Sequence, residues 1–328
     1  MSALLTVRDL VVRFPVKRTR PAQYVHAVED VSFEIERGKT LGLVGESGSG
    51  KSTVGNAVMK LVPAVSGSVE FDGVDVLTAK GATLRELRRS IAMVFQDPLA
   101  ALDPRRTIAE SIGEPLQIHG IGNASQRRSR TAEVMDLVGL PKRFAGRYPH
   151  ELSGGQRQRV CIARALAAEP KLVILDEATA SLDVSVGAQI MNLLRRLQAE
   201  IGLSYLFISH DLAAVEYMSD DIMVMYLGNM MEQSPREHIY SAPAHPYTQA
   251  LTSAIPLEDP VQERVRTRIL LEGDIPSPVS PPSGCVFRTR CPLAIDECAE
   301  AKPEAREVHE GQFAACIRAG EKVDQLIR

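Results

Sequence analysis

The chain has 328 residues, of which 38 are basic and 41 acidic, so its net charge is −3. Apolar residues make up 45% and charged residues 24%, which is ordinary for globular proteins and excludes wholesale disorder and fibrous repeats. The length predicts about two domains. The charge balance leaves no bulk basic field for nucleic acid or anionic lipid. Because no run approaches the roughly 18 apolar residues of a membrane helix, we expect a soluble, cytosolic chain unless a partner holds it at a membrane.

The first hundred residues read as strands interrupted by a glycine-rich loop. Two alternating apolar and polar runs predict antiparallel strands, and shorter apolar runs predict buried ones. A helix is expected to begin near Lys51, and Asp72-Gly73 predicts a hairpin turn. The predicted strands are, in chain order, 4–14, 28–35, 40–44, 68–71 and 91–95.

The pattern becomes helical from about residue 98 to 168, and strands then return at 172–175 and 203–208. Between these two strands, apolar residues at i, i+3, i+4 and i+7 predict an amphipathic helix that faces a sheet; they are Ile190, Leu193, Leu194 and Leu197. Alternation of strand and helix implies a largely parallel sheet with right-handed crossovers. A small β unit at 223–226, turning at Gly228-Asn229, is expected to close the domain.

A phosphate-binding loop follows the strand at 40–44 and opens the next helix. Glycines allow the backbone N–H groups to point inward around an anion at the helix N-terminus. Lys51 is placed to reach the β- and γ-phosphates, and the Ser52 hydroxyl to bind Mg²⁺. The alternative is a tight turn without a ligand. The pattern G-x-x-x-x-G-K-[ST] is matched by Gly45, Glu46, Ser47, Gly48, Ser49, Gly50, Lys51 and Ser52.

Two further segments contain candidate catalytic or phosphate-binding residues. The apolar strand at 172–175 ends in Asp176, a carboxylate for Mg²⁺, and Glu177 is the candidate to polarise the attacking water. The second segment is another anion-binding helix start, made of Leu152, Ser153, Gly154, Gly155 and Gln156. One domain does not need a second phosphate cradle for its own nucleotide. This redundancy predicts a dimer in which the second cradle serves ATP bound by a partner.

Together these segments resemble the nucleotide-binding domain of ABC transporters, over residues 1 to about 240. The resemblance implies an α/β P-loop fold with a mixed sheet core, an antiparallel β subdomain and a helical subdomain at about 98–168. It makes Glu177, His210 and Lys51 the catalytic residues, with Thr53 joining the ATP contacts. Gln96 matches the Q-loop, a third group for Mg²⁺ beside Ser52 and Asp176. The D-loop is matched by Ser181, Leu182 and Asp183.

The same resemblance indicates which residue stacks on the adenine base. The family places an aromatic residue before the strand pair that precedes the phosphate loop, and Phe14 occupies that position. A hairpin core residue is the alternative reading of Phe14. Tyr24, in the loop expected after the first strand, is the second choice.

The tail, 241–328, resembles the C-terminal extension of oligopeptide/dipeptide import ATPases. The segments that carry this resemblance are HPYTQAL from His245, GDIPSP from Gly273, PPSGCVFR from Pro281 and RCPLA from Arg290. Within that group the chain is more similar to the F-type than to the D-type ATPase subunit. The resemblance implies ATP hydrolysis that energises an inner-membrane importer, with a second ATPase subunit, two permease subunits and an extracytoplasmic binding protein. Di- or oligopeptides are the favoured solute, while nickel, glutathione and sugar importers share much of the pattern.

Two other classes of ABC protein fit the sequence less well. A soluble ABC ATPase would need a tandem second ATPase domain or a long coiled-coil insertion, and the chain has neither pattern. A non-hydrolytic regulatory subunit would be expected to lack Glu177 or His210, and both are present.

Four of the five cysteines lie in the tail, and a reducing cytosol favours a metal or cofactor over disulfides. The residues indicate only a four-thiolate site. Resemblance to the peptide-import ATPases favours a [4Fe–4S] cluster, which needs four thiolates. Zinc is the alternative, although the close C-x₂₋₄-C pairs typical of structural zinc are missing, and four free thiols are a further reading. The candidate ligands are Cys285, Cys291, Cys298 and Cys316.

Overall fold

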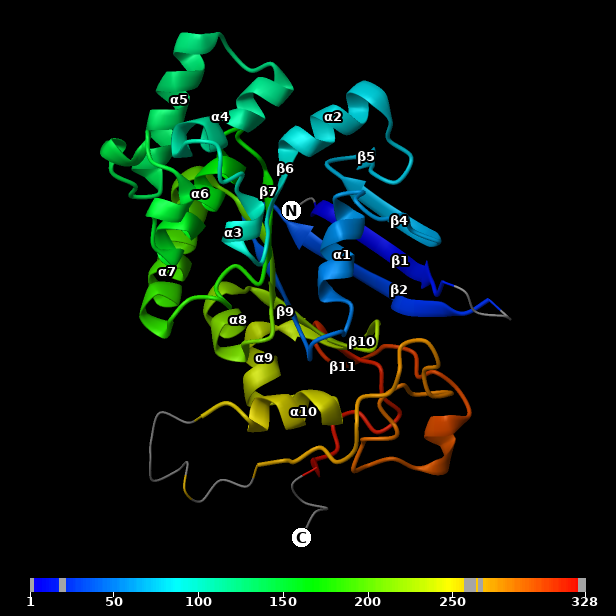
Figure 1. Cartoon of the computed structure of the whole chain (residues 1–328). Helices are drawn as coiled ribbons and strands as arrows, with labels where there is room; N and C mark the ends of the chain where they lie inside the picture. Colours follow the sequence, from blue (N-terminus) through cyan, green and yellow to red (C-terminus); the bar gives the residue numbers. More distant parts are fainter. Residues whose placement is uncertain (1–2, 18–21, 257–263, 265–267, 324–328) are drawn as a thin grey trace.

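The computed structural model describes residues 3–17, 22–256, 264 and 268–323 (Figure 1). The smaller of its two sheets has the strand order β2-β1-β4-β5, and all its strands pair antiparallel. It confirms the predicted strand pair and hairpin, although the second strand begins at residue 24 instead of 28. Its strands are β1 (Ala3–Pro15), β2 (Tyr24–Glu36), β4 (Ser66–Phe71) and β5 (Val74–Asp75).

The larger sheet has the order β11-β12-β10-β9-β3-β8-β7-β6. Strands β9, β3, β8, β7 and β6 run parallel, as the strand–helix alternation predicts, while β10, β12 and β11 add an antiparallel edge. The parallel strands are β9 (Asp221–Tyr226), β3 (Thr40–Val44), β8 (Ser204–Ser209), β7 (Leu172–Asp176) and β6 (Ile91–Val94). The antiparallel edge comprises β10 (Asn229–Pro235), β12 (Gln312–Ala314) and β11 (Arg306–His309).

Helices cover both faces of the larger sheet. On one face α1 (Lys51–Val58) lies between the two sheets, and its Val54, Ala57 and Val58 join a core with both of them. On the other face lie α7 (Val184–Ile201) and α8 (Leu212–Met218). The apolar stripe predicted for α7 is buried against the sheet, which confirms it. The sheet is therefore covered on both sides, as parallel sheets require.

Residues 98–166 contain mainly helices, drawn from cyan to green in Figure 1. Thr107, Asn123 and Ser153 each close a capping box at the start of a helix. The helices are α3 (Pro98–Ala101), α4 (Ile108–His119), α5 (Ala124–Leu137) and α6 (Gly154–Leu166), with short 3₁₀ turns η1 (Lys142–Phe144) and η2 (Pro149–Glu151).

Helix α2 (Gly81–Ser90) is among the helices that were not predicted from the sequence. It is strongly charged and buries only Leu87, so it lacks the apolar stripe by which helices are recognised.

No helix in the described part of the chain is long and apolar enough to cross a bilayer.

The tail builds on the edge of the larger sheet. It contains α10 (Pro246–Ser253), η3 (Asp296–Ala299) and strands β11 and β12, and α9 (Arg236–Ser241) leads into it. The fully buried Glu232 of β10 accepts hydrogen bonds from the backbone N–H groups of Ala244 and His245 and from Gln312 Nε2, at 2.7–3.0 Å. These charge-assisted bonds join two tail segments to β10, one at Ala244-His245 and one at Gln312. The tail thus shares its sheet with the rest of the chain, and a domain boundary at residue 240 stays a prediction.

Candidate functional site

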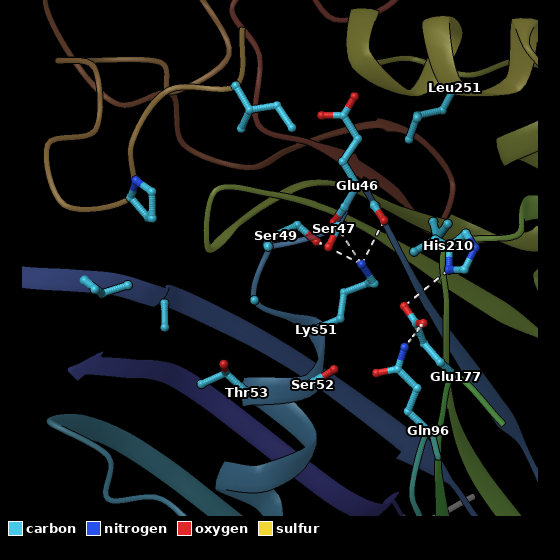
Figure 2. Close-up of a pocket in the computed structure, with 18 of the residues that line it drawn as sticks. Glu46, Ser47, Ser49, Lys51, Ser52, Thr53, Gln96, Glu177, His210 and Leu251 are labelled. Carbon is cyan, nitrogen blue, oxygen red and sulfur yellow. Dashed lines mark hydrogen bonds and ion pairs between the residues drawn. The ribbon is translucent and has the colours of Figure 1, made fainter. Parts of the chain in front are cut away.

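A cavity of about 910 Å³ opens at the carboxyl end of β3, between the smaller sheet and the tail (Figure 2). Ligands of open α/β sheets bind at this end of the strands. The cavity gathers most of the residues that the sequence predicts for ATP. Those that line it are Phe14, Gly45, Glu46, Ser47, Gly48, Ser49, Gly50, Lys51, Ser52, Thr53, Gln96, Glu177 and His210.

The phosphate loop depends on glycines because neighbouring backbone approaches it closely. Gly50 has φ +101°, and a Cβ there would lie 2.1 Å from the carbonyl oxygen of Ala27. A Cβ on Gly45 would lie equally close, 2.1 Å, to the carbonyl oxygen of Met225. The loop is therefore held between β2 and β9, and it directs the N-terminal N–H groups of α1 into the cavity.

Lys51 closes the loop on itself. Its Nζ donates to the carbonyl oxygens of Gly45 and Glu46 at 2.8 and 3.0 Å and to Ser49 Oγ at 3.2 Å. Burial lowers the pKa of Lys51, and the nearby carboxylates of Glu177, Asp176 and Glu46 oppose that shift. The ammonium group is thus a buried cation in a ring of oxygen atoms, at the position where phosphate charge would be held.

Hard oxygen donors suited to Mg²⁺ lie beside the loop. Ser52 Oγ donates to Asp176 Oδ1 at 2.8 Å, so the hydroxyl and the carboxylate that the sequence predicts as ligands are neighbours. Burial raises the pKa of Asp176, the hydrogen bond from Ser52 lowers it, and the charge of Glu177 raises it further. A cation placed here would relieve the cost of this buried carboxylate, so the donor set fits the metal.

Glu177 is held from two sides. Gln96 Nε2 donates to its Oε2 at 2.8 Å, and His210 Nδ1 lies 3.2 Å from its Oε1 (Figure 2). Its backbone has φ +48°, a left-handed conformation that costs a non-glycine residue of the order of 1 kcal/mol. This conformation turns the chain at the end of β7, where Asp176 contacts Ser52 and the side chain of Glu177 reaches the cavity.

The base side of the cavity has an apolar wall. Phe14 contributes to it together with Val25 and Ala27 of β2. Tyr24, the second choice for adenine, is placed differently from the prediction: it belongs to β2, opposite Pro15, is 46% exposed, and does not line the cavity. The wall is therefore an argument for Phe14 over Tyr24.

Sequence reasoning missed the tail's part of this cavity. Ile275 and Pro278 line it, and the Pro278 carbonyl accepts a hydrogen bond from the N–H of His26 at 2.9 Å. Tyr247 Oη accepts from the N–H of Glu46 at 3.1 Å. These residues lie some two hundred positions from the loop in the sequence, and no spacing pattern links them to it.

The residues of the second predicted cradle lie outside the cavity. Ser153 is exposed and caps α6, and its N–H donates to Gln156 Oε1 at 3.0 Å. Asp183 likewise caps α7, accepting from the N–H of Val186 at 2.9 Å. Within one chain, neither segment completes the site. The residues concerned are Leu152, Ser153, Gly154, Gly155 and Gln156, and Ser181, Leu182 and Asp183.

The four tail cysteines are free and converge on a small closed cavity of about 10 Å³, which His245 and Phe287 also line. Burial raises the pKa of Cys291 to about 12 and that of Cys316 to about 11, so both are protonated near neutral pH. Among the described residues, however, no group of three or more His, Cys, Asp or Glu side chains is arranged to hold a metal ion. The thiols are gathered as the sequence suggests, but they are not in ligand geometry, and the cluster stays a prediction.

Comparison with known proteins identifies the class. Residues 28–180 match the ABC transporter family model, and residues 231–298 match the model for the oligopeptide/dipeptide transporter C-terminal region. A dimeric structure of the ATP-binding cassette MJ0796, in a post-hydrolysis state with ADP and phosphate, superposes with a TM-score of 0.64. It is 30% identical and covers 71% of this chain and 98% of its own. The chain is an ABC-type ATPase that binds ATP with Mg²⁺, which confirms the predicted fold class.

Relatives that match almost the whole chain identify the family within this class. A putative peptide import ATP-binding protein of Brucella ovis is 51% identical over 96% of this chain and 98% of its own length. The oligopeptide transport ATP-binding protein OppF of Salmonella typhimurium is 49% identical over 98% of this chain and 97% of its own. The chain belongs to this family of peptide-import ATP-binding proteins.

Replacement of Gly50 tests the loop geometry. We expect Gly50→Ala to weaken ATP binding by roughly tenfold or more, because the new Cβ would have to displace the Ala27 carbonyl and with it the loop. Titration with a fluorescent ATP analogue measures the affinity. Gly73→Ala is the control: Gly73 has φ +79° in the β4–β5 turn, and a Cβ there would meet nothing within 4 Å. Equal affinities of the two variants would contradict this account of the loop.

Proposed function

We propose that this protein is the ATP-hydrolysing subunit of an importer for di- or oligopeptides. The observation that supports ATP hydrolysis is the placement of Glu177 between Gln96 and His210. All three residues line the same cavity as the phosphate loop that contains Lys51. The peptide substrate is supported by the match of residues 231–298 to the oligopeptide/dipeptide transporter C-terminal region and by the names of the relatives. OppF of Salmonella typhimurium and AppF of Bacillus subtilis also support an F-type subunit.

In this proposal the triphosphate lies in the loop from Gly45 to Ser52. Lys51 exchanges the carbonyl oxygens that it now contacts for β- and γ-phosphate oxygens, and the N-terminus of α1 adds its N–H groups. Phe14 stacks on the adenine, and Thr53 adds a contact beside Ser52. Phosphoryl transfer needs mainly positioning and charge stabilisation, which these groups supply.

Mg²⁺ would be held by Ser52, Asp176 and Gln96, and it would neutralise charge on the β- and γ-phosphates. Glu177 then orients the attacking water and accepts its proton. His210 positions Glu177 and contacts the γ-phosphate, so both residues act on the reacting atoms. Gln96, hydrogen-bonded to Glu177 at 2.8 Å, links the water-activating carboxylate to the metal position.

The second half of each site comes from another ATPase subunit. The helix start at Ser153–Gln156 and the D-loop at Ser181–Asp183 do not line the chain's own cavity and would contact ATP on the partner. Two permease subunits would anchor the pair at the cytoplasmic face of the membrane, and an extracytoplasmic binding protein would deliver the solute. Closure around ATP and release of phosphate would then drive the permeases between their two orientations.

The water-activating role predicts the behaviour of Glu177→Gln. We expect ATP binding to be retained and hydrolysis by the assembled complex to fall by about 100-fold or more, because the amide cannot accept a proton. Phosphate release and nucleotide binding are measured on the same preparation. Glu200→Gln, an exposed residue of α7, is the control for a change of one charge. Normal turnover by the Glu177 variant would contradict the assignment.

The shared-site proposal predicts that Ser153→Arg leaves ATP binding by the isolated chain intact but abolishes hydrolysis in the assembled complex. The arginine would stand where the partner's phosphates are expected, outside the chain's own cavity. Asn123→Arg is the matched control, because it removes an equivalent capping box from α5 at a similar cost of about 1 kcal/mol. Loss of ATP binding by the isolated Ser153 variant would refute the shared site.

The four-cysteine cavity is proposed to hold a [4Fe–4S] cluster, with zinc as the alternative. Four buried or half-buried thiols around one cavity support the donor set in number and type. A cavity of about 10 Å³ has room for only about one water, so the thiols would have to move apart to bind a cluster. When bound, the cluster would supply four metal–thiolate bonds that join the tail segments carrying Cys285, Cys291, Cys298 and Cys316.

Anaerobic purification followed by assays of iron, acid-labile sulfide and zinc tests this prediction. We expect about four iron and four sulfide per chain, as the cluster formula requires. The Cys161→Ala variant is the control, because this buried residue of α6 does not line the tail cavity, and it should keep the full metal content. Stoichiometric zinc without sulfide would show that the site binds zinc instead of a cluster. Absence of both metals would show that the four thiols are free.

A further inference from the structure

A tail residue, Arg290, forms a forked ion pair with the phosphate loop. Its Nη1 lies 2.7 Å from Glu46 Oε2, and its Nη2 lies 3.3 Å from Glu46 Oε1. The arginine side chain is only 8% exposed, and that of Glu46 is 26% exposed. Two parallel N–H···O bonds in a partly desolvated setting are among the stronger side-chain interactions in proteins.

The guanidinium is itself held in place by Tyr226 of β9. Its Nη1 also lies 3.4 Å from Tyr226 Oη, and its charge is 5.8 Å from the Tyr226 ring. Tyr226 packs edge-on against Tyr247 and Phe287, which are both fully buried. Burial alone would lower the pKa of Arg290, but the hydrogen bonds that it donates to Glu46 and Tyr226 raise it, so the group is a permanent cation.

Glu46 presents an electrostatic problem for a phosphate site. It is a carboxylate on the loop itself, it lines the cavity, and its backbone carbonyl contacts Lys51 Nζ at 3.0 Å. An unpaired negative charge here would repel a triphosphate and would compete with it for Lys51. Coulomb interactions of this kind are strong where burial excludes water.

We propose that Arg290 is a positioning residue of the ATP site. Its guanidinium cancels the charge of Glu46, so that the phosphate loop can bind a polyanion. The inference rests on the proposal that Gly45–Ser52 binds the phosphates of ATP. It makes the C-terminal tail a working part of the nucleotide site, because the loop requires a cation from residue 290. Arg290 directly precedes Cys291, so the segment that neutralises the loop also borders the four-cysteine cavity.

A charge-swap series in the full-length chain tests the inference, with the affinity for a fluorescent ATP analogue as the readout. Arg290→Ala should weaken binding by roughly tenfold, because it leaves Glu46 unpaired beside the phosphates. Glu46→Gln should tighten binding by roughly two- to fivefold, because it leaves the cation without its carboxylate. The double variant should bind within about threefold of the wild type, because it restores the charge balance. The loss of affinity caused by Arg290→Ala should be smaller for ADP than for ATP and absent for adenosine.

Lys302→Ala is the matched control. Lys302 also joins the tail to the cassette, through Asp30 at 3.1 Å, but its ion pair is exposed and neither residue lines the cavity. We expect this variant to bind ATP as the wild type does. Thermal unfolding of every variant reports on the fold, and Glu46→Gln keeps the proposal testable if Arg290→Ala fails to fold.

Two results would overturn the role of Arg290. One is an Arg290→Ala variant that binds ATP as well as Lys302→Ala does. The other is a double variant no better than Arg290→Ala, since a purely structural loss in the tail would not be relieved at Glu46. Lys51→Ala separates the inference from its premise: normal ATP binding by that variant would refute the phosphate site itself, and with it the basis for the role of Arg290.

Discussion

Close backbone approach around the phosphate loop is the constraint on which the rest of the site depends. The Ala27 carbonyl of β2 and the Met225 carbonyl of β9 occupy the space that a Cβ would need at Gly50 and Gly45. The smaller sheet, the larger sheet and α1 therefore meet at this loop, and each holds it from a different direction. A loop fixed in this way can present its N–H groups to phosphate without paying much ordering entropy on binding.

Burial then determines the chemistry of the charged groups around the loop. Lys51, Asp176 and Glu177 lie within one desolvated region, where each charge is tolerated because the others and a few hydrogen bonds compensate it. Glu177 additionally adopts a left-handed backbone conformation, which separates its side chain from that of Asp176. The two adjacent carboxylates are therefore placed differently, Asp176 beside Ser52 and Glu177 in the cavity lining.

Much of the fold and most of the site could be predicted because the signals are local. The glycines, Lys51 and Ser52 form one continuous segment whose conformation follows from backbone sterics. Asp176 and Glu177 end a run of apolar residues that is recognisable as a buried strand. Helix α2 was missed because it buries only Leu87, and Tyr24 was misplaced because its strand continues beyond the alternating apolar pattern.

By itself, the sequence determined the phosphate loop and singled out the residues that we propose for Mg²⁺ and for the attacking water, since each motif consists of a few consecutive residues with a definite spacing. Only the tertiary structure decided what surrounds them. Ile275 and Pro278 reach the cavity, and Arg290 reaches Glu46, because the tail is docked on β10 through Glu232. The partners in this buried network are scattered along the chain. The pairing of Arg290 with Glu46 spans 244 positions, and no periodicity or motif encodes such a contact. It follows from the packing of the tail against the loop, because an ion pair requires proximity in space and not in sequence.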